Sequence, residues 1–556
     1  MERKMDSPTP NPQPPAPNPQ PPPWWMSTVI YQIYPRSFQD SNEDGIGDLP
    51  GIVSRLDYLQ DLGIGGIWLS PIYPSPQQDF GYDVSDYTGI NPEYGTMDDF
   101  KTLLEEAHSR DIKIIMDLVL NHTSDEHPWF QEAASSRDSK KHDWYIWREG
   151  IKSQPPTNWK SVFGGSSWQW HEGQGKHYLH SFLKEQPDVN WRNPKLREAM
   201  WDVIRFWLDL GVDGFRLDVV NCFVKDNRFR DNPRRLRGIR SYDRQRHIYD
   251  RDRPEAIKIM GEIRKLVDQY PQRMTVGEVM ADGAGDSQLA ADYCDRGEGL
   301  HMAFDFTFAS CPWRAQRFAE AVDRWQSLLG DEVWPNYVLN NHDRSRSISR
   351  YARRTAGAEE SIPKAKVAGA MLLTLRGTPF LYYGEEIGMT DGRISRGQLR
   401  DPVGKRYWPL HPGRDPVRTP MQWDSSTNAG FSESKPWLPV NKNYLVTNVS
   451  IESLNPQSLL NWYRALIRLR QSEPALHSGS YRRIEAGDGL FCYERTYEDD
   501  RVFVALNFTD KDKTVSLPAV GDWQTLLREN LPTISPLAAK AALPPYGILI
   551  AKASAA

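Results

Sequence analysis

Three carboxylates occupy positions where a barrel enzyme would carry its reactive groups. Asp218 in GVDGFRLDVVN, Glu278 in RMTVGEV and Asp343 in VLNNHDRS each come at the end of an apolar run that turns polar. In an α/β barrel the carboxyl ends of the strands bear the loops that line the mouth. One aspartate after an apolar run is more often a turn residue or a helix cap. Three acidic strand ends in one chain indicate a shared site.

Carboxylates arranged in this way could cleave a glycosidic bond. That reaction needs an acid that protonates the leaving oxygen and a second carboxylate on the opposite side of the anomeric carbon. Asp218 and Glu278 would end neighbouring strands, so they could approach the ~5 Å separation of a retaining enzyme. Arg216, on the same strand face, would keep Asp218 ionised as a nucleophile requires. Apolar Val276 and Val279 would raise the pKa of Glu278, as a general acid requires.

The same residues allow a plainer interpretation. Arg216 and Asp218 could form a buried ion pair without any catalytic part. Taken alone, the spacing does not decide between the two.

Composition limits the partners of the protein. The 556 residues carry a net charge of −5 without long runs of one sign, which argues against nucleic acid or a membrane surface as a partner. The four cysteines are far apart and lack C-x-x-C spacing, so neither a zinc site nor a disulfide framework is predicted. We expect a cytoplasmic protein, monomeric or homodimeric, with a small, weakly charged substrate. No segment resembles a signal peptide or a transmembrane helix.

Apolar runs alternate with amphipathic stretches from Val29 onward. Thr96 and Asp99 have capping-box spacing, and Asn193 followed by Pro194 predicts another helix start. A further helix is predicted over PGIVSRLDYLQDLGI, where the apolar residues have helical spacing. Eight apolar runs with helices between them favour a (β/α)8 TIM barrel, in the α/β class, over a doubly wound sheet.

Three regions depart from this alternation. The Pro-rich segment 1–26 is predicted to be a disordered tail, with the folded part beginning at Met26. Residues 123–192 show weak periodicity and are predicted to form an irregular insertion after the third strand, which divides the barrel into 27–122 and 193–476. Runs such as GLFCYERTY and RVFVALNF predict a C-terminal antiparallel β domain, a β-sandwich, over 477–556.

Several motifs resemble those of the α-amylase family of glycoside hydrolases (glycoside hydrolase family 13), in its α-glucosidase and oligo-1,6-glucosidase branch. The resemblance runs from about Val29 to the end and is carried by DLVLNH at 117–122, QPDVN at 186–190, GFRLDVVN at 214–221, GEV at 277–279 and NNHD at 340–343. It implies that Asp218 is the nucleophile, that Glu278 is the acid/base, and that Asp343 binds sugar hydroxyls and stabilises the transition state. No organic cofactor is implied.

The resemblance also implies a sugar pocket. DFGYD at 79–83 is similar to the family's DNGYD, so Asp79 and Tyr82 would hold and stack on the non-reducing glucose, with Phe80 in place of the usual asparagine. His122 and His342 would donate to ring hydroxyls. Arg216 belongs to the same set of expected pocket residues.

An arginine closes such a pocket in the family. Arg414 resembles the residue that pairs with the pocket aspartate, although Arg418 of the same segment is an alternative. A closed pocket would make the enzyme exo-acting, because a longer chain could not pass through it. Val219, directly after the nucleophile, implies a preference for α-1,6 bonds.

A metal loop is also expected. Oxygen donors alternate along DSNEDGIGDL, as a hard cation requires, although a polar surface loop would look the same. The resemblance implies a structural Ca²⁺ or Mg²⁺ there, away from the chemistry. The expected ligands are Asp40, Asn42, Asp44, the Ile46 carbonyl and Asp48.

The predicted protein is an exo-acting retaining α-glucosidase that removes terminal α-1,6- or α-1,4-linked glucose from disaccharides and short oligosaccharides. One alternative is a transglycosylase of the same family, such as a sucrose or maltose isomerase. Another is a non-catalytic barrel relative, which the presence of all three acids disfavours. The loop over about 227–254 is dense in arginine, and we expect it to be a solvated loop beside the site that could shape the leaving-group subsites.

Overall fold

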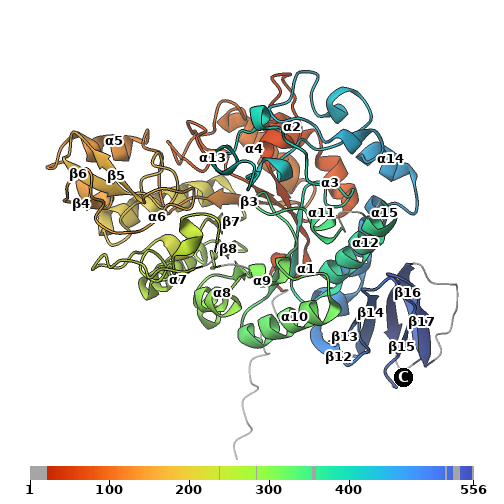
Figure 1. Ribbon diagram of the computed structural model, residues 1–556. Coiled ribbons are helices and arrows are strands. Elements are labelled where there is room, and N and C mark those ends of the chain that lie inside the picture. Colours follow the sequence, from red (N-terminus) through yellow and green to blue (C-terminus); the bar gives the residue numbers. More distant parts are fainter. Residues whose placement is uncertain are drawn as a thin grey trace, which may run out of the picture.

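A nearly closed barrel of eight parallel strands forms the centre of the molecule (Figure 1), within the residues that the computed structural model describes: 22–236, 238–282, 285–352, 358–519, 522–529 and 539–553. Hydrogen-bonded neighbours follow the order β10-β11-β1-β2-β3-β7-β8-β9, and β9 lies beside β10 and completes the ring. The predicted fold class is confirmed. The strands are β1 (Ile30–Ile33), β2 (Gly66–Leu69), β3 (Lys113–Leu118), β7 (Gly214–Leu217), β8 (Met274–Glu278), β9 (Met302–Phe304), β10 (Asn336–Val338) and β11 (Thr378–Tyr382).

Helices between the strands form the outer layer. They are α2 (Leu49–Val53), α3 (Leu56–Leu62), α4 (Met97–His108), α6 (Pro194–Leu210), α7 (Pro254–Val267), α8 (Ser287–Cys294), α10 (Ala315–Leu329), α12 (Ala358–Thr374) and α15 (Leu459–Ser472). Shorter helices lie in the loops: α9 (Phe306–Ala309), α11 (Ser347–Tyr351), α13 (Pro402–Tyr407), α14 (Val449–Leu454) and α16 (Pro474–His477). Among the described helices, none has the length and apolar character needed to cross a bilayer.

The predicted caps account for where two of the long helices begin. Thr96 and Asp99 form a reciprocal capping box on α4, and the Asn193 side chain accepts hydrogen bonds from backbone N–H groups in the first turn of α6.

The single helix predicted over PGIVSRLDYLQDLGI is instead two short helices. The Asp48 side chain caps α2 by accepting from Gly51 N at 2.6 Å, and the chain turns at Ser54 before α3 begins.

Aromatic side chains fill the inside of the barrel. Trp68 stacks on Phe304 at a centroid distance of 5.6 Å, and Phe380 meets the same ring edge-on at 4.9 Å. All three are at most 2% exposed. This packing makes the barrel a solid core, so chemistry is confined to its ends.

The folded chain begins before Met26, which corrects the predicted tail. Residues 1–21 lie outside the described part, but Trp24 already starts the short helix α1 (Trp24–Ser27). Trp25 packs with the barrel interior, and its carbonyl accepts a hydrogen bond from Thr378. Two adjacent indoles offer too much apolar surface to stay in water beside an open barrel end.

The insertion over 123–192 contains regular structure that its sequence did not reveal. Helix α5 (Pro128–Ser135) is followed by a three-stranded antiparallel sheet in the order β4-β6-β5. Its strands are β4 (Trp147–Arg148), β5 (Trp168–His171) and β6 (Lys176–Leu179). They are too short for an alternating pattern to be recognised. The insertion extends from the side of the barrel opposite the C-terminal β domain (Figure 1).

The C-terminal domain consists of two antiparallel sheets. The larger has the order β12-β13-β14-β18-β16 and the smaller pairs β15 with β17. Helices α10 and α12 of the barrel pack on β13 and β14, so the domain adjoins the barrel wall. Its strands are β12 (Ser480–Ile484), β13 (Leu490–Tyr497), β14 (Asp500–Asn507), β15 (Lys513–Ser516), β16 (Trp523–Glu529), β17 (Lys540–Leu543) and β18 (Ile548–Ala553).

Candidate active site

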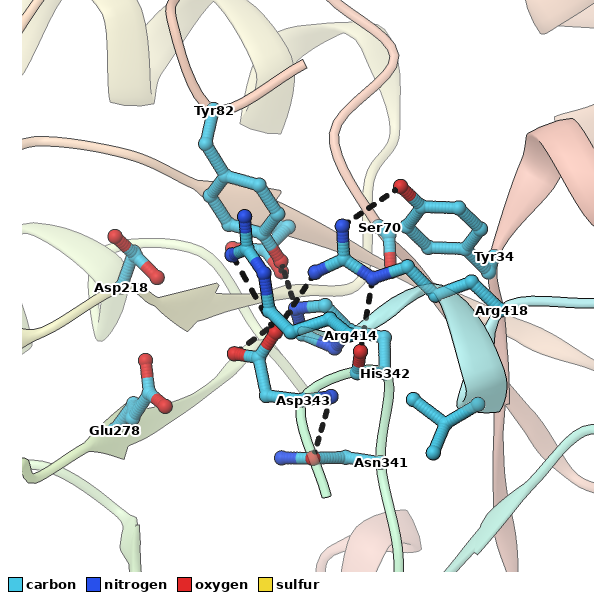
Figure 2. A network of polar contacts seen from close by, with 12 residues as sticks. Tyr34, Ser70, Tyr82, Asp218, Glu278, Asn341, His342, Asp343, Arg414 and Arg418 are labelled. Atoms are coloured by element: carbon cyan, nitrogen blue, oxygen red, sulfur yellow. Dashed lines mark hydrogen bonds and ion pairs between the residues drawn. The ribbon is translucent and has the colours of Figure 1, made fainter. Parts of the chain in front are cut away.

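The three carboxylates predicted to be catalytic meet at the carboxyl ends of the barrel strands (Figure 2). Asp218 directly follows β7 and Glu278 is the last residue of β8. These strands pair with Leu217 opposite Gly277, so the two acids leave the barrel side by side. Asp343 comes from the loop after β10 and faces them across the network.

One buried arginine connects three carboxylates below the mouth. Arg216 Nη1 donates to Asp117 Oδ1 and Asp218 Oδ1, both at 2.7 Å, and Nη2 donates to Glu278 Oε2 at 2.5 Å. The Arg216 side chain is 1% exposed. It is not among the residues that line the cavity, and its predicted contact with substrate stays a prediction. Its geometry instead holds Asp218 and Glu278 toward each other.

Sharing one cation changes the expected ionisation of the nucleophile. Burial raises the pKa of Asp218 well above its ordinary value, and the neighbouring Glu278 and Asp117 add to the rise, while Arg216 opposes it. Burial likewise raises the pKa of Asp117 to about 6, against the pull of Arg216. This rise in pKa acts against the expectation that Arg216 keeps Asp218 ionised, because one guanidinium serves three carboxylates in a nearly dry site.

Two arginines bind the carboxylates on the other side of the site. Arg414 Nη2 pairs with Asp79 Oδ1 at 2.5 Å and with Asp401 Oδ1 at 2.7 Å. Arg418 Nη2 donates to Asp343 Oδ1 at 2.8 Å. The arginine that pairs with the pocket aspartate is thus Arg414, and Arg418 supports Asp343.

The pKa of Asp343 lies below its ordinary value. Burial at the site opposes ionisation, but the guanidinium charges of Arg414 and Arg418 favour the carboxylate and outweigh it. The Asp343 side chain is 34% exposed and faces the cavity. A carboxylate that stays ionised beside the reacting sugar can stabilise positive charge that develops there.

His342 lies behind Tyr82 and does not line the cavity. Its ring stacks on Tyr82 at 5.4 Å, and its Nε2 is 2.6 Å from the Tyr82 hydroxyl. Its Nδ1 lies 2.7 Å from Gln32 Nε2. Both ring nitrogens thus have protein partners, and the expected contact between His342 and a sugar hydroxyl stays a prediction. Burial lowers the pKa of His342 to about 3, so the ring is neutral.

His122 lines the cavity as expected. Its Nε2 is 3.0 Å from the Tyr82 carbonyl oxygen and 3.1 Å from Gln186 Nε2. Burial lowers its pKa to about 4. A neutral imidazole at this wall can exchange hydrogen bonds with a neutral sugar without introducing charge.

The site residues surround a cavity of about 300 Å³, a size suited to a small ligand. Asp79, Tyr82, His122, Asp218, Val219, Glu278, Asp343 and Arg414 line it, as do Phe163 and Phe182 from the insertion. The Asp79–Arg414 pair lies in its wall. Arg414 also stacks on Phe163 at 5.0 Å, which joins the insertion to this wall.

Val219 has a strained backbone. Its φ of 37° and ψ of 50° place it in the left-handed region, which β-branched residues rarely occupy. The side chain is 4% exposed and lines the cavity beside Asp218. Strain of this kind is typical of functional sites whose surroundings fix the geometry.

The loop expected to bind a metal is folded by its own side chains. Asp40 Oδ1 accepts from Asn42 N at 3.0 Å, Asn42 Oδ1 from Asp44 N at 3.0 Å, and Asp44 Oδ1 from Ile46 N at 2.8 Å. Throughout the described ranges, no group of three or more histidine, cysteine, aspartate or glutamate side chains is arranged to hold a metal. The loop lies apart from the cavity lining.

The arginine-rich loop reaches the site at one point. Arg240 lines the cavity, and its Nη2 donates to Asp243 Oδ1 at 2.8 Å. Other arginines of the loop have acidic partners as well, such as Arg230 with Asp226. Leu236 and Ile239 are exposed beside them.

Three supporting residues were not singled out from the sequence. Asp117 and Gln186 open the DLVLNH and QPDVN motifs, so the signal was present in residues used only to recognise the family. Asp401, which is fully buried and holds Arg414, stands in no motif. Only the fold brings it beside the pocket.

Clustered acids and a sugar-sized cavity at the mouth of an eight-stranded barrel define a glycoside hydrolase. Residues 32–479 match the family model "Alpha amylase, catalytic domain", and 481–550 match "Maltogenic Amylase, C-terminal domain". The chain belongs to the α-amylase family of glycoside hydrolases, enzymes that hydrolyse glycosidic bonds.

Similar proteins cover nearly the whole chain. A probable alpha-glucosidase of Rhizobium meliloti (strain 1021) is 42% identical over 511 residues, covering 89% of this chain and 91% of the relative. The oligo-1,6-glucosidase of Parageobacillus thermoglucosidasius is 40% identical over 528 residues, covering 89% and 92%. The crystal structure of the alpha-glucosyl transfer enzyme XgtA matches with a TM-score of 0.89 at 37% identity, covering 96% of this chain and all of the other.

Proposed function

We propose that this protein is an exo-acting, retaining α-glucosidase that releases terminal non-reducing glucose from disaccharides and short oligosaccharides with α-1,6 or α-1,4 bonds. One observation carries the proposal. Asp218 and Glu278 are held by the same guanidinium at a cavity whose wall contains the Asp79–Arg414 pair. Relatives named α-glucosidase and oligo-1,6-glucosidase support the substrate class.

The chemistry follows from the roles of the two acids. Asp218 attacks the anomeric carbon while Glu278 gives its proton to the leaving oxygen, which forms a glucosyl ester on Asp218. Glu278 then takes a proton from water as the water attacks the same carbon from the opposite side, and Asp218 leaves as a carboxylate. Two inversions retain the α configuration. Asp343, held ionised by Arg414 and Arg418, stabilises the positive charge on the sugar ring.

This cycle needs one proton in the Asp218–Glu278 pair. Burial and the neighbouring carboxylates raise the pKa of Asp218, which favours keeping one proton within the pair, and catalysis begins when that proton resides on Glu278. Carboxylates that share a cation titrate as a unit. The rate should therefore fall both at low pH, where both are protonated, and at high pH, where neither is.

Exo action follows from the proposed position of the terminal glucose against Asp79 and Arg414. Their ion pair would block a chain from continuing past that sugar. The side chains of Asp79 and Arg414 are 5% and 14% exposed, so water has little access to the pair. Maltose and isomaltose should be cleaved, and starch should yield glucose only from chain ends.

A hydrolysis panel tests the proposal. Maltose, isomaltose, trehalose, sucrose and starch are supplied separately, and the first-formed anomer is read by NMR. Asp218→Asn and Glu278→Gln should each lower kcat roughly a hundredfold to ten-thousandfold while circular dichroism stays unchanged. Azide should restore turnover to Glu278→Ala. Near-wild-type turnover in either of the first two variants, or β-glucose as first product, would contradict the assignment.

Transglycosylation, as in the sucrose or maltose isomerases of the family, is the second candidate. The similarity to the alpha-glucosyl transfer enzyme XgtA favours it, because transfer and hydrolysis differ only in what attacks the glucosyl ester. Product analysis with concentrated sucrose or maltose separates the two. New disaccharides indicate transfer. If every glucosyl group is instead released as free glucose, the reaction is hydrolysis.

We also propose a structural Ca²⁺ or Mg²⁺ in the Asp40–Asp48 loop. Asn42 Oδ1 and Asp44 Oδ1 each accept one backbone hydrogen bond and retain a second lone pair for a hard cation. Asp40, Asp48 and the Ile46 carbonyl would complete the set. The ion would stabilise the fold and take no part in the reaction.

A further inference from the structure

One side of the cavity is apolar. Two of its residues are close in sequence to the reacting carboxylates: Val219 directly follows Asp218, and Met280 comes two residues after Glu278. The others come from the insertion and from α13. They belong to, or pack against, one buried hydrophobic cluster that includes Cys222. The side chains are Val162, Val219, Met280 and Val403.

This apolar side is where the leaving group must be. Glu278 protonates the leaving oxygen, so whatever carries that oxygen lies next to Glu278 and its neighbour Met280. The Met280 backbone is fixed, because its N–H donates to Asn221 Oδ1 at 2.9 Å and its carbonyl accepts from Asn221 Nδ2 at 2.7 Å. The thioether side chain lines the cavity, and its Sδ lies 3.9 Å from Cys222 Sγ.

The two polar side chains named for this side, Arg240 and His411, each have protein partners. Arg240 donates to Asp243 through Nε at 3.1 Å and Nη2 at 2.8 Å, and reaches the Val162 carbonyl through Nη1 at 3.5 Å. His411 Nδ1 accepts from Gly413 N at 3.0 Å. A second sugar would bring several hydroxyls to a wall with few free partners, and each unpaired hydroxyl costs about 1–3 kcal/mol.

Charge does not favour an anionic partner either. The guanidinium of Arg240 is balanced by the Asp243 carboxylate at hydrogen-bond distance. The pair presents no net charge to a phosphate or a carboxylate. An apolar alcohol remains the chemistry that matches both the side chains and the charge of this wall.

We propose that the leaving-group side of the pocket selects apolar aglycones, so that alkyl and aryl alcohols capture the glucosyl-enzyme better than polyhydroxy acceptors of the same size; this rests on the proposed function. In the capture step the alcohol oxygen bonds to the anomeric carbon as the bond to Asp218 breaks. Glu278 takes the hydroxyl proton, and Asp218 is released as a carboxylate. The product is an alkyl or aryl α-glucoside.

A competition for one intermediate tests the proposal. The donor is p-nitrophenyl α-glucoside, so released nitrophenol counts every glucosyl-enzyme formed and free glucose counts capture by water. The acceptors are cyclohexanol and myo-inositol at equal concentration, which share a six-carbon ring and differ in hydroxyl number. We expect the cyclohexyl glucoside to form at least about ten times faster than the inositol product. Equal capture, or a preference for inositol, would overturn the inference.

Variants then locate the preference. Met280→Gln places an amide in the wall and should lower the cyclohexanol preference about tenfold, whereas Met280→Leu should preserve it. Val446→Thr, on a residue 70% exposed outside the cavity, is the matched control and should change nothing. A preference unchanged in Met280→Gln would refute the role of this wall. If the wild type fails to release nitrophenol, the proposed function falls; if it releases nitrophenol without the preference, only this inference falls.

Discussion

Arg216→Met removes the one cation that three carboxylates share. Methionine keeps much of the side-chain length without the charge, so Asp117, Asp218 and Glu278 would lose their common partner. The three contacts span 2.5 to 2.7 Å around a side chain that is 1% exposed. Removing one member of a buried ion pair costs about 3–5 kcal/mol. At roughly 2 °C per kcal/mol, the melting temperature at pH 7.5 should fall by about 6–10 °C.

The loss should depend on pH in a defined direction. A carboxyl whose pKa is higher in the folded than in the unfolded protein contributes stability at acidic pH and loses it as the pH rises through the folded pKa. For Asp117, this contribution is lost over the pH range from the ordinary aspartate pKa to a folded-state pKa of about 6. Removing Arg216 should raise the folded-state pKa further and so extend that pH range upward. Each pH unit is worth ~1.4 kcal/mol per proton, so the loss at pH 5.5 should be up to about 3 kcal/mol smaller than at pH 7.5.

Thermal unfolding followed by circular dichroism at both pH values measures the effect. Arg205→Met is the control, since Arg205 pairs with Glu198 and Asp202 on the exposed face of α6 and should cost less than about 1 kcal/mol at either pH. Arg216→Lys should lie between the wild type and Arg216→Met, because one ammonium cannot reach three carboxylates. A loss no larger than that of the control, or one that grows toward acidic pH, would refute the reasoning.

The other predictions concern linkage, support and metal. Val219→Thr should move the isomaltose-to-maltose ratio of kcat/KM toward maltose by roughly tenfold, from a wild type that cleaves isomaltose at least as well; an unchanged ratio would assign linkage to the arginine-rich loop. Asp401→Asn should raise KM about tenfold with a smaller change in kcat, because Arg414 loses the carboxylate that orients it; an unaltered KM would mean that Arg414 needs no support. Chelation should lower the melting temperature and leave initial rates unchanged, and Asp44→Ala should abolish that shift; immediate loss of turnover in the folded enzyme would contradict a structural metal.

Local rules accounted for the parts of the molecule that depend on neighbours in the chain. The capping box at Thr96 and Asp99 predicted the start of α4, since both partners lie within one turn. Apolar runs that turn polar predicted the strand ends that carry Asp218 and Glu278. The barrel itself followed from how often that pattern repeats. These features need only short-range spacing, which a sequence displays directly.

Features that depend on packing between distant segments could not be predicted. The sharing of Arg216 with Asp117 requires the register between β3 and β7, and the pairing of Arg414 with Asp401 has no spacing rule. His342 stands beside Asp343 in sequence, yet its ring stacks on Tyr82 of another loop and is not part of the cavity lining. The roles predicted for the site residues stay predictions for the experiments above.

The left-handed backbone of Val219 links the stability of the fold to the selectivity of the cavity. Holding a β-branched residue in that conformation costs of the order of 1–3 kcal/mol, which glycine would not incur. Val219→Gly would relieve this strain, but it would also remove a buried apolar side chain and add the entropy that glycine loses on folding. The same change removes a side chain from the cavity wall beside Asp218 and widens the space through which the leaving group departs. Variants at this position should consequently be compared on two linkages as well as on melting temperature, because relief of the backbone strain comes with looser discrimination between leaving groups.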